Sequence, residues 1–316
     1  MRQFPRGVVL VEADVGDRNS LDVALLKHRP EAVLHFAGFI EAGESMRSPE
    51  KYFRNNSAVT LTLIEAMLAK GIDKLIYSST AALYGEPEHI PIVETDTLKP
   101  ANAYGESKLL VEQMLRWFNR AHGFRYASLR YFNAAGSDGH SGECHQPETH
   151  LIPLVLQAAA GKRDAVSIFG SDYATPDGTC VRDYIHVSDL ADAHVRALEA
   201  LSRHDRLIYN LGKGRGFKVR EVIESARRVT GRPFEVIEAG RRPGDPAALV
   251  ASSAKIRAEL AWAPQHVELD AIIASAWEWM QQHSAAYGHA PIDSTDQVGT
   301  DTIPQENWGL CTRAIS

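Results

Sequence analysis

The feature that most constrains the fold of this sequence is an alternation between short apolar runs and longer segments of helical period. The apolar runs, rich in β-branched and aromatic residues, are typical of strands and lie at residues 8–12, 32–36, 74–78 and 126–132. Between them, apolar residues recur at helical spacing over residues 21–28, 49–70 and 102–121. Strands that alternate with helices usually run parallel, because each helix returns the chain to the start of the next strand. The alternation therefore predicts an α/β fold built on a doubly wound parallel sheet.

The pattern changes after about residue 136. Residues 136–149 are rich in Gly, Ser, His and Glu, which is typical of a long loop between domains or over a site. We expect residues 1–135, joined in part by 180–215, to form the sheet domain, and residues 136–288 to form a smaller mixed α/β domain. Residues 289–316 show no sustained period and predict a mobile tail. Candidate elements of the second domain are helices at 151–160, 187–202, 217–230 and 269–283, and strands at 207–211 and 234–238.

The composition argues against several classes of function. The 40 acidic and 34 basic residues give a formal net charge of −6 and are mixed along the chain, without the basic stripe of a nucleic-acid binder. No run approaches the roughly 18 apolar residues of a membrane span, and the first residues lack the apolar core of a signal peptide. The three cysteines, Cys144, Cys180 and Cys311, form no C-x-x-C pair, which argues against a disulfide framework and a zinc site. A cytoplasmic protein without a bound metal fits best.

The pentapeptide YGESK at residues 104–108 is the clearest candidate for chemistry. A tyrosine and a lysine four residues apart share one face of a helix, where the ammonium favours the phenolate and lowers the pKa of the phenol. A phenol ordinarily has a pKa of about 10, so this pairing would let Tyr104 act as a base near neutral pH. We expect the apolar stripe from Leu110 to Ala121, which includes Trp117, to face the core. The spacing alone is common on surface helices, so its meaning depends on context.

Three of the expected strands end in residues suited to a ligand, because ligands collect at the carboxyl ends of parallel strands. The residues are Asp14 with Val15, Ala37 with Gly38, and Thr80. Asp14 would accept a hydrogen bond from an adenine amino group, and Ala37-Gly38 would let a pyrophosphate or ribose approach the backbone. A hydroxyl at Thr80 would hold a substrate alcohol in line with Tyr104. Taken singly, the strand-ending Asp and Gly residues are equally explained as turn formers, and His35 is better explained as a packed strand residue than as a base or a metal ligand.

Two basic loops of the second region, around Arg182 and Arg242, would suit a diphosphate. The planar guanidinium group donates two parallel hydrogen bonds to paired phosphate oxygens. An aspartate stands near each arginine, Asp183 in the first loop and Asp245 in the second. A local salt bridge therefore explains this pattern as well as a ligand does.

Several motifs, in order along the chain, resemble the extended short-chain dehydrogenase/reductase family. They are HFAG at residues 35–38, the spacing Tyr104-x-x-x-Lys108, and RYFN at residues 130–133. Within that family the sequence is similar to the UDP-glucose 4-epimerase branch. The shared motifs are GES at 43–45, YxxNN at 52–56, SSTAALYG at 78–85, LRYFNAAG at 129–136, the segment 168–194, and RRPGD at 241–245.

The resemblance implies a Rossmann-like domain that holds NAD, a smaller domain that holds a UDP-hexose substrate, and a homodimer. It implies that Tyr104 takes the proton of the hexose 4-hydroxyl while hydride passes to NAD. The 4-keto sugar then turns over and is reduced on its other face, which interconverts UDP-glucose and UDP-galactose. Lys108 would lower the pKa of Tyr104, and Thr80 would bridge the substrate oxygen and the phenol.

The resemblance also implies two sets of binding residues. The cofactor positions are Asp14, Val15, Phe36, Ala37, Gly38, Phe39, Ile40, Asn55, Tyr104, Lys108 and Phe132. The substrate positions are Thr80, Tyr104, Asn133, His150, Leu151, Ser167, Ile168, Phe169, Arg182, Arg242, Asp245 and Leu249. Leu249 stands where the size of the side chain gates N-acetylated sugars in the family, and its intermediate bulk leaves that specificity open.

One departure from the family bears on activity. Its members begin with a strand and a G-x-x-G-x-x-G turn that holds the pyrophosphate, and no such turn follows the first expected strand of this sequence. Residues 8–12 would correspond to the third strand, so we expect roughly 40 residues to be missing from the middle of the sheet. Three hypotheses follow. The chain is a truncated or mis-started form of an active enzyme, which we favour; or its third strand pairs with the fourth and it binds NAD weakly; or it is an inactive UDP-sugar-binding remnant.

A nucleotide-sugar 4,6-dehydratase is the competing activity within the family. That reaction also removes water across C5 and C6, which needs an acid and a base directly after the Ser/Thr that ends this strand. Ala81 and Ala82 stand there instead. The sequence therefore favours epimerisation.

Overall fold

The structure is a computed structural model that describes residues 7–242 and 244–283. The mobile tail expected at residues 289–316, and Cys311 within it, lie outside the described residues. The thiol of Cys180 is buried and free, whereas Cys144 is disulfide-bonded, which the sequence analysis did not expect.

The larger sheet has four strands in the order β1-β2-β3-β7, all paired in parallel. The strands are β1 (Val33–His35), β2 (Lys74–Thr80), β3 (Arg125–Tyr131) and β7 (Arg206–Leu211). The α/β class and the parallel Rossmann-like sheet that the alternation predicts are therefore confirmed. Six of the seven residues of β2, and six of the seven of β3, are buried, as expected for central parallel strands covered on both faces.

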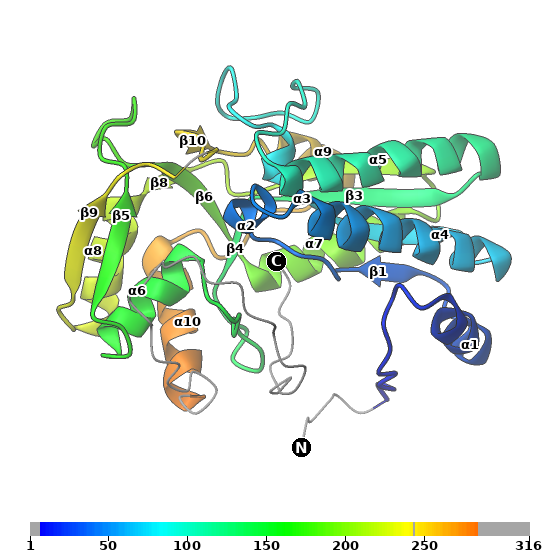
Figure 1. The fold of residues 1–316 in the computed structure, drawn as a ribbon, viewed down its shortest axis with the longest axis horizontal. Coiled ribbons are helices and arrows are strands. Elements are labelled where there is room, and N and C mark those ends of the chain that lie inside the picture. Colours follow the sequence, from blue (N-terminus) through cyan, green and yellow to red (C-terminus); the bar gives the residue numbers. More distant parts are fainter. Residues whose placement is uncertain (1–6, 243, 284–316) are drawn as a thin grey trace.

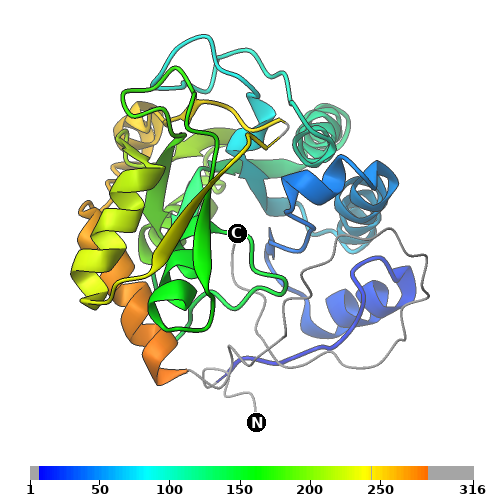
Figure 2. The ribbon, with the colours of Figure 1, turned by 60° about the vertical axis from the view of Figure 1, so that its left-hand side comes forward.

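Helices cover both faces of this sheet, and the side-chain alternation of the strands shows which helices cover which face. Leu75 and Tyr77 pack in one cluster with α1 (Arg18–His28), α4 (Val59–Ala69) and α5 (Ala103–His122). Ile76, between them on β2, packs in another cluster with α7 (Val187–Ala200) and α9 (Ala254–Leu260). Figure 2 shows α4 and α5 almost end-on, side by side on one side of the sheet.

Local signals place α5 where the sequence predicts it. The Asn102 side chain caps the first turn by accepting a hydrogen bond from the Gly105 N–H at 2.9 Å. Gly123 ends the helix with a φ of 66°, a left-handed conformation that favours glycine. The expected apolar stripe is confirmed only in part. Met114 and Phe118 pack against the core cluster of Leu75 and Tyr77, whereas Trp117 is 58% exposed and the fully buried apolar side chains are those of Val111 and Leu115. The helix thus turns the face that carries Lys108 toward the sheet.

The segment predicted as one helix over residues 49–70 is helical but changes type twice. It consists of α3 (Pro49–Tyr52), the π-helical η1 (Phe53–Ala58) and α4. In η1 the buried side chains are the polar Asn56 and Ser57, whereas the largest buried side chains of α4 are apolar. A π-helical turn contains about one more residue than an α-helical turn, so the two halves face different neighbours.

The rest of the chain forms a second region around two smaller sheets. In one, β6 (Val181–His186) pairs in parallel with β4 (Asn133–Ala135) and β10 (Ala248–Leu249), and antiparallel with β8 (Gly216–Lys218). In the other, β5 (Ala165–Phe169) pairs in parallel with β9 (Glu235–Ala239). Three helices, α6 (Leu151–Ala159), α8 (Val219–Thr230) and α10 (Leu269–Gln282), pack over them. Figure 1 shows this region at one end of the molecule, with α1, β1 and α4 at the other.

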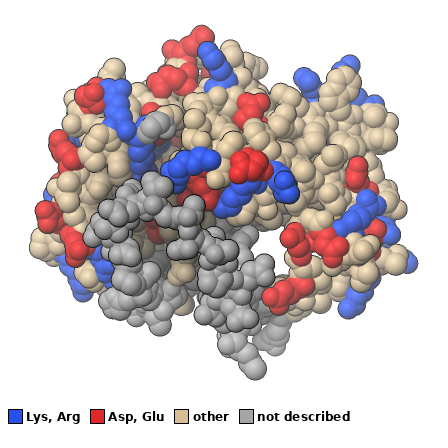
Figure 3. All heavy atoms as spheres, in the orientation of Figure 1, with Lys and Arg blue, Asp and Glu red and all other residues tan. Residues whose placement is uncertain are grey.

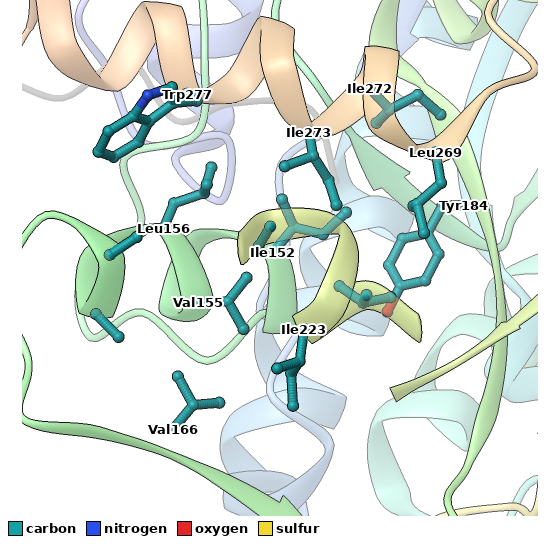
Figure 4. Packing of buried hydrophobic residues seen from close by; sticks show 14 of the residues in the cluster. Ile152, Val155, Leu156, Val166, Tyr184, Ile223, Leu269, Ile272, Ile273 and Trp277 are labelled. Carbon is teal, nitrogen blue, oxygen red and sulfur yellow. The ribbon is translucent and has the colours of Figure 1, made fainter. Parts of the chain in front are cut away.

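An apolar core fixes the helices of the second region relative to its sheets. Figure 4 shows Ile273 of α10 directed toward Ile152 of α6, with Ile223 of α8 and Tyr184 of β6 in the same cluster. All four side chains are buried. The predicted helices of this region are confirmed to within a few residues, whereas β5 and β6 were not predicted. No helix or strand lies between β4 and α6, so the long loop expected at residues 136–149 is confirmed.

The strand predicted at residues 8–12 is wrong. These residues form no regular structure, and Val8, Val9, Leu10 and Val11 are exposed. An apolar run becomes a strand only where a neighbouring strand pairs with its N–H and C=O groups, and within the described residues β1 is paired with β2 alone. The hypothesis that the third strand pairs with the fourth is therefore also wrong.

The surface carries charges of both signs. Figure 3 shows lysine and arginine interspersed with aspartate and glutamate on the face that it presents. Among the helices of residues 7–242 and 244–283, none has the length and apolar character that crossing a membrane requires.

Candidate active site

The three catalytic candidates lie together at the carboxyl end of β2. Thr80 ends this strand, and its hydroxyl accepts a hydrogen bond from the Ala82 N–H at 3.1 Å. The same hydroxyl is hydrogen-bonded to the phenol of Tyr104, in the first turn of α5. One turn further along, Lys108 is only 3% exposed, and its Nζ donates to the Ser78 carbonyl at 3.0 Å. The tyrosine, the lysine and the threonine that the sequence singled out are thus neighbours.

The pKa of Tyr104 differs from the prediction. Burial raises the pKa of this phenol, and the hydrogen bond to Thr80 offsets the increase only in part. Burial also lowers the pKa of Lys108 to about 8. The expectation that Lys108 lowers the pKa of Tyr104 is therefore wrong for this structure, because desolvation dominates both groups. A further positive charge brought beside the phenol would lower its pKa.

His35 is a packed strand residue, as the sequence analysis favoured. It is buried in β1, with its Nε2 atom 2.9 Å from the Thr60 hydroxyl. Burial lowers the pKa of His35 to about 3, so the imidazole is neutral over the physiological range. The ring therefore packs and hydrogen-bonds, and it does not serve as a base.

Asn56 holds the loop after β1, which carries five of the predicted cofactor positions. The Phe39 N–H donates to Asn56 Oδ1 at 2.8 Å, and Asn56 Nδ2 donates to the Phe39 carbonyl at 3.0 Å. The same Nδ2 donates to the Ser107 hydroxyl of α5 at 3.0 Å. Sequence reasoning chose the neighbouring Asn55 and missed Asn56, although both belong to the YxxNN motif.

The loop brings Gly38 against Lys108. A Cβ on Gly38 would lie 3.1 Å from Asn56 Oδ1 and 3.4 Å from Lys108 Nζ, so a side chain there would crowd the lysine. An ammonium has three N–H donors, and one of them is used by the Ser78 carbonyl. This arrangement fits the nicotinamide ribose of a dinucleotide, which needs donors beside an open backbone. The spacing G-x-x-G-x-x-G occurs at Gly136, Gly139 and Gly142, in the loop between β4 and α6. Within the described residues it does not join a strand of the larger sheet to the following helix, where it would hold the pyrophosphate.

The other predicted cofactor positions have mixed surroundings. Asp14 is exposed, and its Oδ1 accepts from the Gly16 N–H at 2.7 Å, as in an ordinary turn. The ring of Phe36 lies 5.1 Å from the ring of His194, between centroids. Phe132 is buried in a small cluster with Ala81 and Leu249. Val15 is half-buried and packs against the cluster of α1, α4 and α5. Three positions lie outside these contacts: Ala37 is exposed, and Ile40 and Asn55 are half-buried.

A cavity of about 310 Å³ collects most of the predicted substrate positions. This volume lies at the lower end of the range for small-molecule sites. Ile168 does not line the cavity, since the alternation of β5 directs its side chain into the core. Thr80, Tyr104 and Leu249 also lie outside its lining. The predicted residues that do line it are Asn133, His150, Leu151, Ser167, Phe169, Arg182, Arg242 and Asp245.

The two arginines of the cavity are held in different ways. Arg182 Nη2 forms a short ion pair with Asp245 and none with the adjacent Asp183, so a salt bridge between these sequence neighbours is wrong for Arg182. The carboxylate of Asp183 instead accepts three backbone N–H groups, from Lys213 at 2.9 Å, Gly214 at 3.0 Å and Ala251 at 3.2 Å. The guanidinium of Arg242 lies 3.7 Å from the centre of the Phe169 ring. Both arginines therefore present charge to the cavity from fixed positions.

Sequence reasoning missed the acidic residues that orient His150. Glu148 Oε1 lies 2.9 Å from His150 Nδ1 and accepts the His150 N–H at 2.7 Å. Burial alone would lower the pKa of His150, but the Glu148 carboxylate raises it above the ordinary value. Burial raises the pKa of the nearby Glu143 to about 7. A second cavity, of about 360 Å³, also includes Glu143 and His150 in its lining, so His150 stands between the two cavities.

The fold and this site together define a class of protein. A parallel sheet with a threonine at the end of a central strand, and a tyrosine and lysine four residues apart on the following helix, is the arrangement of short-chain dehydrogenase/reductases. Residues 2–212 match the NAD dependent epimerase/dehydratase family. The chain belongs to that family.

Named relatives lie within this family. The UDP-glucose 4-epimerase of Halalkalibacterium halodurans is 48% identical over 283 residues, which cover 89% of this chain and 85% of the relative. A crystal structure of UDP-glucose 4-epimerase matches with a TM-score of 0.86 and 45% identity, over 90% of this chain and 88% of that chain. The Brucella ovis UDP-glucose 4-epimerase in complex with NAD matches with a TM-score of 0.81 and 45% identity, over 84% and 83%.

Proposed function

We propose that this chain interconverts UDP-glucose and UDP-galactose by NAD-dependent epimerisation at C4. The observation that carries the proposal is the Tyr104–Thr80 hydrogen bond at the end of β2, with the buried Lys108 beside it. A phenol and a hydroxyl so placed can hold one sugar alcohol between them and move its proton. The names of the relatives and the cavity lined by Arg182 and Arg242 support a UDP-hexose as the substrate.

NAD, when bound, supplies the acceptor and donor of hydride at C4. We assign its ribose to Lys108 and its remaining contacts to the loop of Phe36 to Ile40, with Asn55, Phe132, Asp14 and Val15. Tyr104 exchanges a proton with the 4-hydroxyl of the sugar, and Thr80 orients that hydroxyl toward the phenol. Arg182 and Arg242 hold the diphosphate, together with the other cavity residues that the sequence analysis assigns to the substrate. Firm binding of the nucleotide leaves the 4-keto sugar free to turn.

Neither alternative activity is favoured. Dehydration would require an acid and a base after Thr80, and Ala81 and Ala82 offer neither. The hypothesis of an inactive remnant rests on the lack of a G-x-x-G-x-x-G turn after the first expected strand. It predicts UDP-sugar binding without turnover.

A coupled assay tests the proposal. The 316-residue chain is incubated with UDP-galactose and saturating NAD, and UDP-glucose is detected through UDP-glucose dehydrogenase. Tyr104→Phe should lower turnover by about 10²- to 10⁴-fold, because it removes general acid–base catalysis. Calorimetric binding of UDP should stay unchanged, because Tyr104 does not line the UDP cavity.

The matched control is Tyr209→Phe. It removes a hydroxyl that donates to Glu259 at 2.7 Å, away from β2, and should retain turnover. Wild-type protein that binds UDP but shows no turnover would establish the remnant hypothesis instead. Equal turnover of the wild type and Tyr104→Phe would refute the assignment of Tyr104.

We also propose that the protein is a homodimer of the cytoplasm. Sedimentation equilibrium should give twice the chain mass, and a monomer at micromolar concentration would contradict the dimer.

A further inference from the structure

A buried ionic network lies next to the Tyr104–Thr80 pair and has no part in the predicted site. At its centre are Glu112 of α5, which is 6% exposed, and Arg130 of β3, which is 2% exposed. Arg130 donates to both carboxylate oxygens, from Nη2 at 2.7 Å and from Nε at 3.1 Å. The Ser79 hydroxyl donates to the same carboxylate at 2.6 Å. One carboxylate of α5 therefore connects two strands of the sheet.

The network continues across the sheet. Arg130 Nη1 donates to the Tyr84 hydroxyl at 2.7 Å, and that hydroxyl donates to Asn210 Oδ1 of β7 at 2.7 Å. The strand register pairs Ser79 with Arg130 and Arg130 with Asn210, so these side chains form one row over three adjacent strands. The row stands one residue before Thr80 on β2. It therefore fixes the sheet at the level of the catalytic strand end.

Glu112 is the point where α5 joins this row. It lies four residues after Lys108 and eight after Tyr104, so the three side chains share one face of the helix. Its partner Ser79 precedes Thr80, the hydrogen-bond partner of Tyr104. Any rotation of α5, or any shift along its axis, would separate Glu112 from Ser79 and Tyr104 from Thr80 together.

Stability alone does not explain such a network. A buried ion pair loses about as much free energy by desolvation as it gains by attraction, and apolar residues of similar volume often replace it without loss. A rigid bidentate pair does, however, restrict the relative positions of the elements that it joins. Here the restriction acts next to the Tyr104 phenol and the Thr80 hydroxyl, which must lie together to hold one sugar alcohol between them.

We propose that Glu112 is a positioning residue, which with Ser79 and Arg130 fixes α5 on β2 so that the Tyr104 phenol meets Thr80. This proposal depends on the proposed function only for the identity of the reaction, epimerisation at C4, in which the Tyr104 phenol takes part. It assigns Glu112 no contact with the substrate or the cofactor.

Two variants and one control test this role in the full chain. Glu112→Gln weakens the ion pair, and Ser79→Ala removes only the link to β2 and adds no buried charge. Both should lower kcat, Glu112→Gln by about 10- to 100-fold, because small displacements at a reacting centre have effects of this size. KM and the affinity for UDP should not change. The control is Asp73→Asn, which disturbs another arginine pair, at the opposite end of β3, where Arg125 donates from Nε and Nη2 to one oxygen of Asp73, and it should leave kcat unchanged.

A second readout does not depend on activity. The ring signal of Tyr104 is observed by NMR with ¹³Cζ-labelled tyrosine and is assigned by its loss in Tyr104→Phe. In Ser79→Ala this signal should shift and the pKa of Tyr104 should rise, because a displaced phenol loses the hydrogen bond that lowers it. If the wild type is inactive, the proposed function fails while this measurement still decides the role of Glu112. An unchanged Tyr104 signal in Ser79→Ala, with kcat per folded molecule unchanged in an active enzyme, would overturn the proposal.

Discussion

Replacing Gly105 with alanine tests whether the close approach of α5 to β2 sets the catalytic geometry. A Cβ at position 105 would lie 2.6 Å from the Ala82 carbonyl oxygen and 3.1 Å from Pro100 Cβ. Ordinary contact begins at 3.4 Å, so the first turn of α5 must move by about 0.8 Å, since the oxygen that it meets belongs to the backbone. Thr80 lies two residues before Ala82. The movement therefore separates Tyr104 from Thr80.

Gly105→Ala should change the free energy of unfolding only slightly but should lower turnover strongly. Alanine favours a helix over glycine by about 1 kcal/mol, whereas overpacking costs about 1–3 kcal/mol, so the free energy of unfolding should fall by only about 0–2 kcal/mol. Turnover should fall by about 100-fold, because a displacement near 1 Å at the reacting centre has that effect.

The assay combines urea unfolding with the coupled epimerase measurement, and its control is Gly43→Ala. Gly43 lies in the short helix α2 (Ala42–Ser45), where a Cβ would meet no atom within 4 Å. Turnover should therefore match the wild type, and the free energy of unfolding should stay equal or rise by up to about 1 kcal/mol. A Gly105→Ala protein that is as active as the wild type, and at least as stable, would refute this explanation of the glycine.

Two further predictions follow from the second region. Arg242→Met should weaken UDP binding by about 10- to 100-fold in calorimetry, since hydrogen bonds to charged groups contribute about 1.5–3 kcal/mol. Arg241→Met is the control, because Arg241 pairs with Asp172 and lies outside the cavity lining, so this variant should bind UDP like the wild type. Equal UDP affinities of the two variants would contradict the prediction. Burial raises the pKa of Asp183 from 3.8 to about 6, so the stability that this group contributes is present below about pH 4 and lost as the pH rises through 6. Urea unfolding should show Asp183→Asn gaining about 2–3 kcal/mol relative to the wild type between pH 4 and 7, and parallel pH profiles would contradict it.

The elements that could be predicted are those whose signals are local. The bounds of α5 follow from a capping side chain at Asn102 and a left-handed glycine at Gly123, both within a turn of the helix. The strand predicted at residues 8–12 has the right composition, but a strand also needs a partner, which composition does not reveal. Strand β6 was missed for the opposite reason: it has strand partners but not the composition of a strand. Its polar residues Arg182 and Asp183 interrupt the apolar pattern, and the groups that pair with them, such as Asp245 and the Lys213 N–H, lie far along the chain.

The candidate site likewise has features that local sequence predicts and features that depend on the surrounding structure. The spacing of Tyr104 and Lys108 predicts that both side chains share a helix face, and they do. The direction of the Tyr104 pKa shift could not be predicted, because it depends on how much water the surrounding elements remove from the phenol. Asn56 could have been found only by knowing that the chain turns through a π-helix at this point.

That π-helical turn restricts how this part of the gene can change length. The first half of the helical segment directs Asn56 to the Phe39 loop and to Ser107, whereas the second half directs Leu63 and Met67 into the core. Because a π-helical turn takes up about one extra residue, loss of one residue within η1 would restore regular α-helix and leave the two halves nearly in phase. Loss of one residue within the regular α4 would instead rotate the side chains beyond it by roughly 100°, so that Met67 would no longer face the core. Within this segment, η1 is therefore the place where a change of one residue in length can be absorbed.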